Sequence, residues 1–373
     1  MIDVLEIRGF NRELIGVIDT AKSIIWHSVY FGVGDFEIYA QLTQQHLLLL
    51  QIGYYVTRSD NDEVGVIEKI DVTYSVQDGY MIAASGRFAK SILDRRLIYR
   101  LSGNTNTPSI LRGNVEIAVR QLVLDNAISC SFDSKRNIAV LALGGLANLP
   151  AIIVDENGNA AQKQVSYQNL MEYTDEVLQE YGYAAKVILN QSNKKLLYVV
   201  YSGEDRSAEN TEGNTAVIFS TDYENITSTE YVYNRQEWRT AALIGGEGEG
   251  LERFYSLLTN GSVSLSLREL WVDASSINKT YKEDDVEHTY TDEEYNEMLI
   301  QAGKKELVTR RPVETFSGEI NASFGNWIFG RDFFVGDLVT LQDNNINKYA
   351  TVRILEATEV QDENGYKVDV VYS

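Results

Sequence analysis

The chain of 373 residues has little of several residue types on which common functions depend. Cysteine occurs once, at Cys130, which excludes a disulfide framework within the chain and a zinc site built from cysteines. The histidines, His27, His46 and His288, lack His-Glu-x-x-His and His-x-His spacing, so a metallopeptidase centre is not indicated. No apolar run reaches the about 18–20 residues of a transmembrane helix, and we expect no membrane anchoring by this chain.

Positive charge is also scarce. The chain has 33 Lys and Arg against 54 Asp and Glu, and its formal net charge is −21. Such a chain repels nucleic-acid phosphates and anionic lipid, which argues against coating either. Its 44 % hydrophobic content is ordinary for a globular protein and excludes wholesale disorder. At roughly 100–200 residues per domain, the length predicts two or three domains.

The residues that are present favour strands. The chain has 23 tyrosines and only 3 prolines, a composition that suits pleated, half-buried surfaces. Charged and apolar residues alternate over 35–40, which predicts a strand. Asp78-Gly79 and Asn364-Gly365 predict two hairpin turns. Segments 229–233 and 239–244 flank a polar turn and predict a further hairpin.

Four segments have helical spacing of their apolar residues instead. Asn114 is the expected N-cap of the second segment, and Ser166 that of the third. Gly182 and Gly303 are the expected ends of the third and fourth segments. The four predicted helices cover 87–96, 115–124, 167–181 and 291–303.

Two segments invite a binding hypothesis. The glycine-rich run 245–250 has two carboxylates and no Lys-Ser/Thr, so it does not match a phosphate-binding loop. A flexible turn, or a close backbone approach between subunits, explains it better. The acidic run 283–285, with Glu287 and His288, has oxygen ligands for a cation but not the spacing of an EF-hand. A solvated loop is the favoured interpretation.

No catalytic constellation stands out. Cys130 has no activating partner nearby in sequence, and a buried thiol is the better interpretation. Gly-x-Ser-x-Gly is absent, and sequence alone nominates no carboxylate pair for a glycosidase. The four tryptophans suit core packing or subunit contact at least as well as a sugar platform. We therefore predict no catalytic, cofactor-binding or metal-binding residue, and we expect no enzyme.

Several motifs nevertheless occur in an order that resembles a known family. Residues 30–37 (YFGVGDFE) follow Trp26, and 86–96 (GRFAKSILDRR), 201–206 (YSGEDR) and 217–220 (VIFS) come next. They are followed by 245–250 (GGEGEG), 268–274 (RELWVDA) and 336–339 (GDLV). In this order the chain resembles the siphophage tail-hub, or baseplate-hub, proteins, which are similar to the amino-terminal structural part of tail-associated lysins. The resemblance implies structural signature residues at Trp26, Gly34, Asp35, Phe36, Glu37, Gly86, Arg87, Arg95, Gly245, Gly246, Glu247, Gly248, Glu249, Gly250, Asp273, Gly336 and Asp337.

The resemblance also implies an architecture. It is α+β and β-rich, with two tube-like β-barrel domains, inserted mixed α/β domains and assembly as a ring. Residues 1–85 are then the first barrel, completed by strands in 191–245, and 86–190 form a helix-containing insertion. Residues 246–373 form the second barrel, with a helical insertion near 275–303.

The function that the resemblance implies is structural. Three copies form a hub at the distal end of the tail tube of a phage or prophage, linking tube to tail tip. The implied partners are a distal tail or tail-tube protein, a tail-tip, fibre or spike protein, and tape-measure protein and DNA that pass without specific binding. The chain would be made in the host bacterial cytoplasm and reside in the virion, at the tail tip or baseplate. A tail-associated peptidoglycan hydrolase and a receptor- or glycan-binding tail protein are the alternatives.

Overall fold

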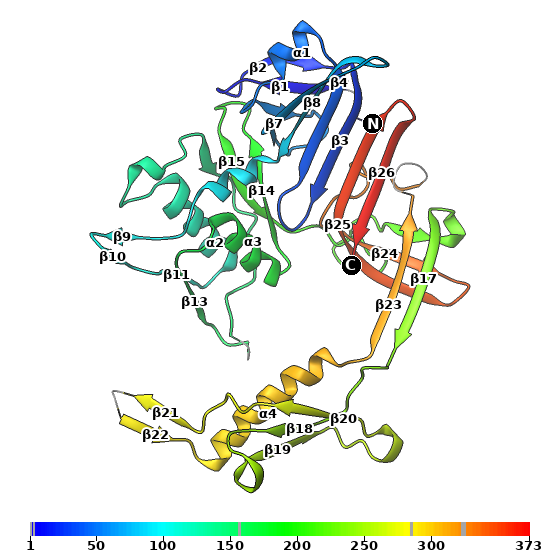
Figure 1. Ribbon diagram of the computed structural model, residues 1–373. Helices are drawn as coiled ribbons and strands as arrows, with labels where there is room; N and C mark the ends of the chain where they lie inside the picture. Colours follow the sequence, from blue (N-terminus) through cyan, green and yellow to red (C-terminus); the bar gives the residue numbers. More distant parts are fainter. Residues whose placement is uncertain (1, 3, 156–157, 284–285, 322–325) are drawn as a thin grey trace. The chain divides into compact units, whose positions relative to one another are not determined.

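The computed structural model describes residues 2, 4–155, 158–283, 286–321 and 326–373. Their contacts divide the chain into two compact units, and each is described by itself. The large unit comprises Met1–Ser228 and Gly318–Ser373, and the small unit comprises Thr229–Ser317. Strands dominate both units (Figure 1). Among the described residues, no helix combines the length and the apolar character that crossing a membrane requires.

An eight-stranded sheet is the centre of the large unit (Figure 1). Its strand order is β16-β24-β25-β3-β4-β8-β7, and β26 pairs with β25. The alternation predicted over 35–40 is confirmed, because buried and exposed residues alternate along β4. Both predicted turns are confirmed too, since Gly79 begins β8 and Gly365 begins β26. The bounds are β3 Ala21–Val29, β4 Asp35–Gln41, β7 Lys69–Ser75, β8 Gly79–Arg87, β16 Ile218–Ser220, β24 Leu338–Asp343, β25 Lys348–Asp362 and β26 Gly365–Tyr372.

A four-stranded sheet, in the order β2-β1-β5-β6, shares a hydrophobic core with this first sheet. Trp26 and Phe36 of the eight-stranded sheet are in that core with Leu5 and Ile7 of β1. The bounds are β1 Leu5–Arg8, β2 Leu14–Ile18, β5 Tyr55–Thr57, β6 Gly65–Val66 and the short helix α1 Gln44–Leu49.

The helix-containing part of the large unit has a core of its own. As predicted, Asn114 caps a helix by accepting a hydrogen bond from the Ile117 N–H at 3.0 Å. The predicted cap at Ser166 is wrong, because Asn169 accepts from the backbone N–H groups of the helix that follows it. The elements are η1 Ala89–Arg95, β9 Leu101–Ser102, β10 Thr105–Asn106, β11 Ser109–Arg112, α2 Val115–Val123, η2 Leu124–Ile128, η3 Ser134–Arg136, β12 Leu141–Leu143, β13 Gln162–Val165, α3 Leu170–Glu180, β14 Ala184–Leu189, β15 Leu196–Tyr201 and η4 Thr221–Tyr223.

The small unit is a sheet in the order β19-β18-β20 with helix α4 packed on one face (Figure 1). The predicted helix end at Gly303 is wrong, since α4 continues past it. Gly303 is buried there against Ile244 of β18 and leaves no room for a Cβ atom. The elements are β18 Ala241–Gly245, η5 Gly250–Glu252, β19 Tyr255–Thr259, η6 Ser264–Ser266, β20 Glu269–Asp273, β21 Thr280–Glu283, β22 Val286–Thr289 and α4 Asp292–Thr309.

The predicted hairpin of 229–233 with 239–244 is also wrong. β17 (Ile226–Asn234) pairs with β23 (Val313–Ile320), and β18 pairs with β19 and β20 instead. The two segments therefore do not pair with each other, although they are neighbours in sequence.

The expected β-rich class is confirmed, but none of the sheets in the described ranges closes on itself. Strands β24 to β26, which belong to the expected second barrel, lie in the same sheet as β3, because β25 pairs with β3 over residues 356–361. The barrel boundaries and the ring stay proposals.

Candidate functional site

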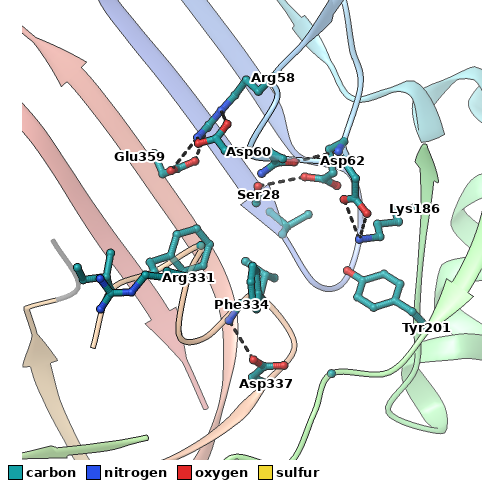
Figure 2. Close-up of a pocket in the computed structure, with 18 of the residues that line it drawn as sticks. Ser28, Arg58, Asp60, Asp62, Lys186, Tyr201, Arg331, Phe334, Asp337 and Glu359 are labelled. Carbon is teal, nitrogen blue, oxygen red and sulfur yellow. Dashed lines mark hydrogen bonds and ion pairs between the residues drawn. The ribbon is translucent and has the colours of Figure 1, made fainter. Parts of the chain in front are cut away.

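A pocket of about 700 Å³ lies within the large unit (Figure 2). Three stretches of chain line it, within residues 58–63, 201–206 and 328–337. Ser28 and Val29 of β3 and one residue each of β14, β25 and β26 complete the lining. Most of its charged side chains are paired with one another. These pairs decide what the pocket can do.

Arg58 connects the amino-terminal part of the chain to strand β25 near the carboxyl terminus. It is buried, and its guanidinium donates to both carboxylate oxygens of Asp60 at 2.9 and 2.7 Å. It also donates to both oxygens of the buried Glu359 (Figure 2). Glu359 accepts a third hydrogen bond from the Tyr366 hydroxyl at 2.6 Å. Burial alone would raise the pKa of Asp60, but the hydrogen bonds from Arg58 outweigh it and hold that pKa below its usual value. The guanidinium lies 5.3 Å from the centre of the Trp26 ring.

Glu63 is the most perturbed carboxyl group of the pocket. Desolvation raises its pKa to about 7, although a hydrogen bond from the Ser28 hydroxyl at 3.0 Å and the positive charge of Lys186 oppose the rise. Lys186 itself pairs with Asp62 at 2.9 Å and lies 4.8 Å from the centre of the Tyr201 ring (Figure 2). A carboxyl group with this pKa exchanges protons near neutral pH, which a general acid requires.

Asp337 organises the opposite side of the pocket. Its carboxylate accepts from the backbone N–H groups of Glu204 at 2.8 Å and Phe334 at 3.0 Å (Figure 2). It also accepts from Nε of Arg206 at 3.0 Å. Burial nevertheless raises the pKa of Asp337 above its usual value, because desolvation outweighs these hydrogen bonds. The side chain therefore ties the 328–337 loop to the 201–206 segment.

The first group of signature residues lies in neighbouring strands of the eight-stranded sheet. Trp26 is opposite Phe36 across β3 and β4, and Phe36 is opposite Gly86 across β4 and β8. Trp26 and Phe36 are buried with their ring centres 5.8 Å apart, whereas the side chain of Glu37 is exposed. A Cβ atom at Gly86 would lie 1.8 Å from the Val66 carbonyl oxygen, so only glycine permits this approach.

Gly34 and Asp35 belong to the same group. A Cβ atom at Gly34 would lie 2.1 Å from the backbone oxygen of His27. Asp35 is opposite His27, and its carboxylate lies 3.2 Å from Nδ1 of that ring. The other ring nitrogen lies 3.2 Å from the carboxylate of Glu356 on β25. One imidazole thus bridges two carboxylates on the strands either side of it.

The remaining signature residues of this region are at the end of β8 and beyond. Arg87 donates to both carboxylate oxygens of Glu68 at 2.9 and 3.1 Å, and to Asp94 at 3.1 Å. Arg95 ends η1 and is exposed. Gly336 has a positive φ of 101° next to the Tyr30 ring, a conformation that favours glycine.

The glycine-rich loop belongs to the small unit. A Cβ atom at Gly245 would lie 2.3 Å from the Trp271 ring, and one at Gly246 would lie 2.7 Å from the Tyr295 hydroxyl. The Glu247 N–H donates to that hydroxyl at 2.7 Å, so the loop is tied to α4. Gly248 and Gly250 have positive φ values of 99° and 57°, and the Glu249 side chain is exposed. The close backbone approach is therefore made within one unit.

Asp273, at the end of β20, is linked to the glycine-rich loop through Arg253. Its carboxylate pairs with Arg253 at 2.5 Å, and Arg253 also donates to the carbonyl oxygens of Gly245 and Gly246. The signature residues thus lie in both units. The glycines and buried rings among them fix backbone or packing, whereas Glu37, Arg95 and Glu249 are exposed.

Of the other candidates, Cys130 is buried, as predicted. The proposed cation site of 283–285 includes two residues, Asp284 and Asp285, that lie outside the described ranges. Within the described residues, no group of three or more His, Cys, Asp or Glu side chains is placed to hold a metal ion.

Sequence reasoning missed Arg58, Glu63, Lys186 and Glu359. Arg58 and Glu359 are 301 residues apart, and nothing in the local pattern of either connects them. Arg206 lies within a segment that carried the family resemblance, yet its pairing with Asp337 has no sequence signal.

Solved structures of phage tail proteins are similar to this chain in fold, and two of them follow. The 43 kDa tail protein of prophage MuSo2 from Shewanella oneidensis has 11 % sequence identity and a TM-score of 0.53, and the match covers 99 % of this chain and 97 % of that one. A tail protein from Neisseria meningitidis MC58 has 14 % identity and a TM-score of 0.51, over 98 % and 95 % of the two chains. At these identities the likeness concerns the fold alone.

The comparison with curated protein sequences finds no match. The profile of one sequence family, described as Siphovirus ReqiPepy6 Gp37-like protein, matches residues 4–372. This match confirms the expected link to siphophage proteins. The chain belongs to the family of Siphovirus ReqiPepy6 Gp37-like proteins.

Proposed function

We propose that this chain is a structural protein of a phage or prophage tail and forms the trimeric hub at the distal end of the tail tube. The observation that carries the proposal is the end-to-end likeness to a prophage tail protein, which covers 99 % of this chain and 97 % of the other. The siphovirus family supports the same assignment. In this role the hub links the tube to a tail-tip, fibre or spike protein and frames the channel.

The charge of the chain suits a channel. Three copies carry three times −21, or −63, formal charges. Carboxylates that face a lumen repel the phosphates of passing DNA and keep it from adhering. We therefore propose an acidic, non-adhesive lumen, through which tape-measure protein and DNA pass without specific binding.

The pocket fits a structural role better than a catalytic one. Arg58, Lys186 and Arg206 each hold a carboxylate that comes from a different stretch of chain, so these ion pairs join segments. Breaking the buried pair of Arg58 and Glu359 is expected to cost about 3–5 kcal/mol, whereas the more exposed pair of Lys186 and Asp62 contributes less. Such bonds stabilise the unit and need no substrate.

Electron microscopy of purified virions tests the proposal. Gold-labelled antibodies against the chain are expected at the distal tip of the tail only. Label along the whole tail or on the head, or virions without label, would overturn the hub assignment. Light scattering gives a second test, since three chains of 42.0 kDa have a mass of 126 kDa.

Peptidoglycan hydrolysis is the second candidate, and Glu63 is the observation that favours it. A carboxyl group with a pKa of about 7 in a pocket rich in other carboxylates is a feature of glycosidases. A cell-wall zymogram separates the two functions. A cleared band that Glu63→Gln abolishes would establish the hydrolase, and no clearing is expected of a hub.

A further inference from the structure

The sheet of the small unit has a helix on one face only. Ala242 and Ile244 of β18 and Val272 of β20 point to α4 and are buried with Tyr295 and Leu299 of that helix. Alternate residues of a strand point to opposite faces, so the residues between them form the second face. We call this second face of β18, β19 and β20 the outer face.

The outer face is apolar at its centre. Strand register places Leu243 of β18 between Leu257 of β19 and Trp271 of β20, in one row across the sheet. The next row is Tyr255, Gly245 and Asp273, and the Tyr255 and Trp271 ring centres are 6.3 Å apart. The side chains of the four large apolar residues are 40–61 % exposed. A sheet with a solvated second face normally carries polar residues there.

The apolar area of this face approaches what a protein interface needs. Taking ~200 Å² for a whole large side chain, the four exposed fractions leave about 400 Å² of apolar area uncovered. A standard interface buries about 800 Å² on each partner, of which a little more than half is apolar. Four side chains therefore supply nearly the apolar share of one side of such an interface.

Charge argues for a second copy as the occupant. Residues 254–267, which include β19 and the loop after it, contain no Asp, Glu, Lys or Arg in a chain that is 23 % charged. On the outer face, Asp273 is neutralised by Arg253, which leaves Glu269 at one corner. Two copies of a chain of charge −21 repel each other except where charge is absent. A strongly cationic partner would be matched by carboxylates, which the centre of this face does not have.

We propose that the outer face of β18, β19 and β20 is a surface through which copies of this chain contact one another. The inference rests on the proposed function, since it names a contact within the proposed trimer. The glycine at position 245 then serves this surface, because a Cβ atom there would lie 2.3 Å from the Trp271 ring. The Arg253 guanidinium lies 5.0 Å from the centre of that ring.

Leu257→Glu tests the proposal, with Val76→Glu as the matched control. Val76 is 94 % exposed and lies in the turn between β7 and β8, in the large unit. Light scattering is expected to give the mass of an assembly for the wild type and for Val76→Glu, and 42.0 kDa for Leu257→Glu. Circular dichroism checks that each variant is folded. An assembled Leu257→Glu would overturn the inference and leave the hub proposal in place.

If Leu257→Glu does not fold, maleimide labelling of a cysteine at the same position tests the proposal instead. The one cysteine of the wild type, Cys130, is buried and serves as the unreactive background. Leu257→Cys therefore adds one accessible thiol. We expect maleimide to react slowly with Leu257→Cys in the assembly and at least tenfold faster after dilution to monomers. Protection that does not change with dilution would indicate cover from within the same polypeptide and overturn the inference.

A wild type that is monomeric at every concentration, with a reactive Leu257→Cys, would also overturn it. The labelling of virions judges the hub proposal separately, because it does not depend on which surfaces of the chain meet.

Discussion

His27 is expected to make the stability of the large unit depend on pH. Each nitrogen of its ring lies 3.2 Å from a carboxylate, that of Asp35 on one side and that of Glu356 on the other. A neutral imidazole has one N–H and satisfies one of these acceptors, whereas the imidazolium satisfies both. Burial alone would lower the pKa of His27, but the hydrogen bonds and charges of the two carboxylates outweigh it and raise that pKa above 6.5.

The sign of the effect follows from the raised pKa. The stabilising contribution is complete below the pKa of the unfolded chain and is lost as pH rises through the higher pKa of the folded protein. The imidazole is partly exposed, which weakens both ion pairs, and we expect about 1 kcal/mol for the two together. Such a change corresponds to a shift of roughly 2–4 °C in Tm for a unit of this size.

The measurement compares the wild type with His27→Gln from pH 5.5 to 9. The difference in Tm isolates His27, because His46 and His288 are common to both proteins. We expect the wild type to be more stable at pH 5.5 and the difference to shrink towards zero at pH 9. A difference that does not change with pH, or an NMR titration of His27 at or below 6.5, would refute the reasoning.

Three further substitutions have defined outcomes. Arg58→Leu leaves the buried Glu359 unpaired and is expected to lower the free energy of unfolding by about 3–5 kcal/mol in urea. Gly303→Ala is expected to destabilise the small unit by about 1–3 kcal/mol despite alanine's higher helix propensity, because its Cβ atom would lie 2.8 Å from the Ile244 side chain. Glu63→Gln is expected to leave a cell-wall zymogram as blank as that of the wild type.

Each has a control. Lys367→Gln removes the exposed ion pair with Asp369 and is expected to change stability by at most about 1 kcal/mol. Gly145→Ala adds a Cβ atom where nothing lies within 4 Å, so it is expected to be neutral. Equal losses in Arg58→Leu and Lys367→Gln, or in Gly303→Ala and Gly145→Ala, would contradict the structural reasons given for them.

Local signals in the sequence predicted local structure. The alternation over 35–40, the turn at Asp78-Gly79 and the cap at Asn114 each depend on a few adjacent residues, and the structure has all three. The wrong predictions concern features of secondary structure that depend on residues distant in sequence. Gly303 resembles a helix end until Ile244 is placed against it, and the partner of β17 is β23 rather than the nearby β18.

The pocket could not be predicted from the sequence, because its residues are distant from one another in the chain. Its ion pairs join positions that no sequence periodicity relates, such as Arg58 with Glu359 and Arg206 with Asp337. Their pairing appears only once β25 lies beside β3 and the 328–337 loop lies beside the 201–206 segment. The signature residues, by contrast, come from the family resemblance. The structure supplies a physical reason at some of them, such as Gly34 and Gly86, where a Cβ atom has no room.

The small number of cations relates the ion pairs of the pocket to the surfaces proposed above. Arg58 and Arg206 are each engaged with a buried carboxylate, so their charge is used to join segments rather than to balance the surface. Each of these cations is matched by the carboxylate that it holds, so the exterior keeps the excess of 54 anions over 33 cations. Like charge disfavours contact between copies of such a protein except where charge is low or complementary, and it repels DNA. The proposed contact at the outer face of the small unit and the proposed acidic channel are therefore both expected from one composition.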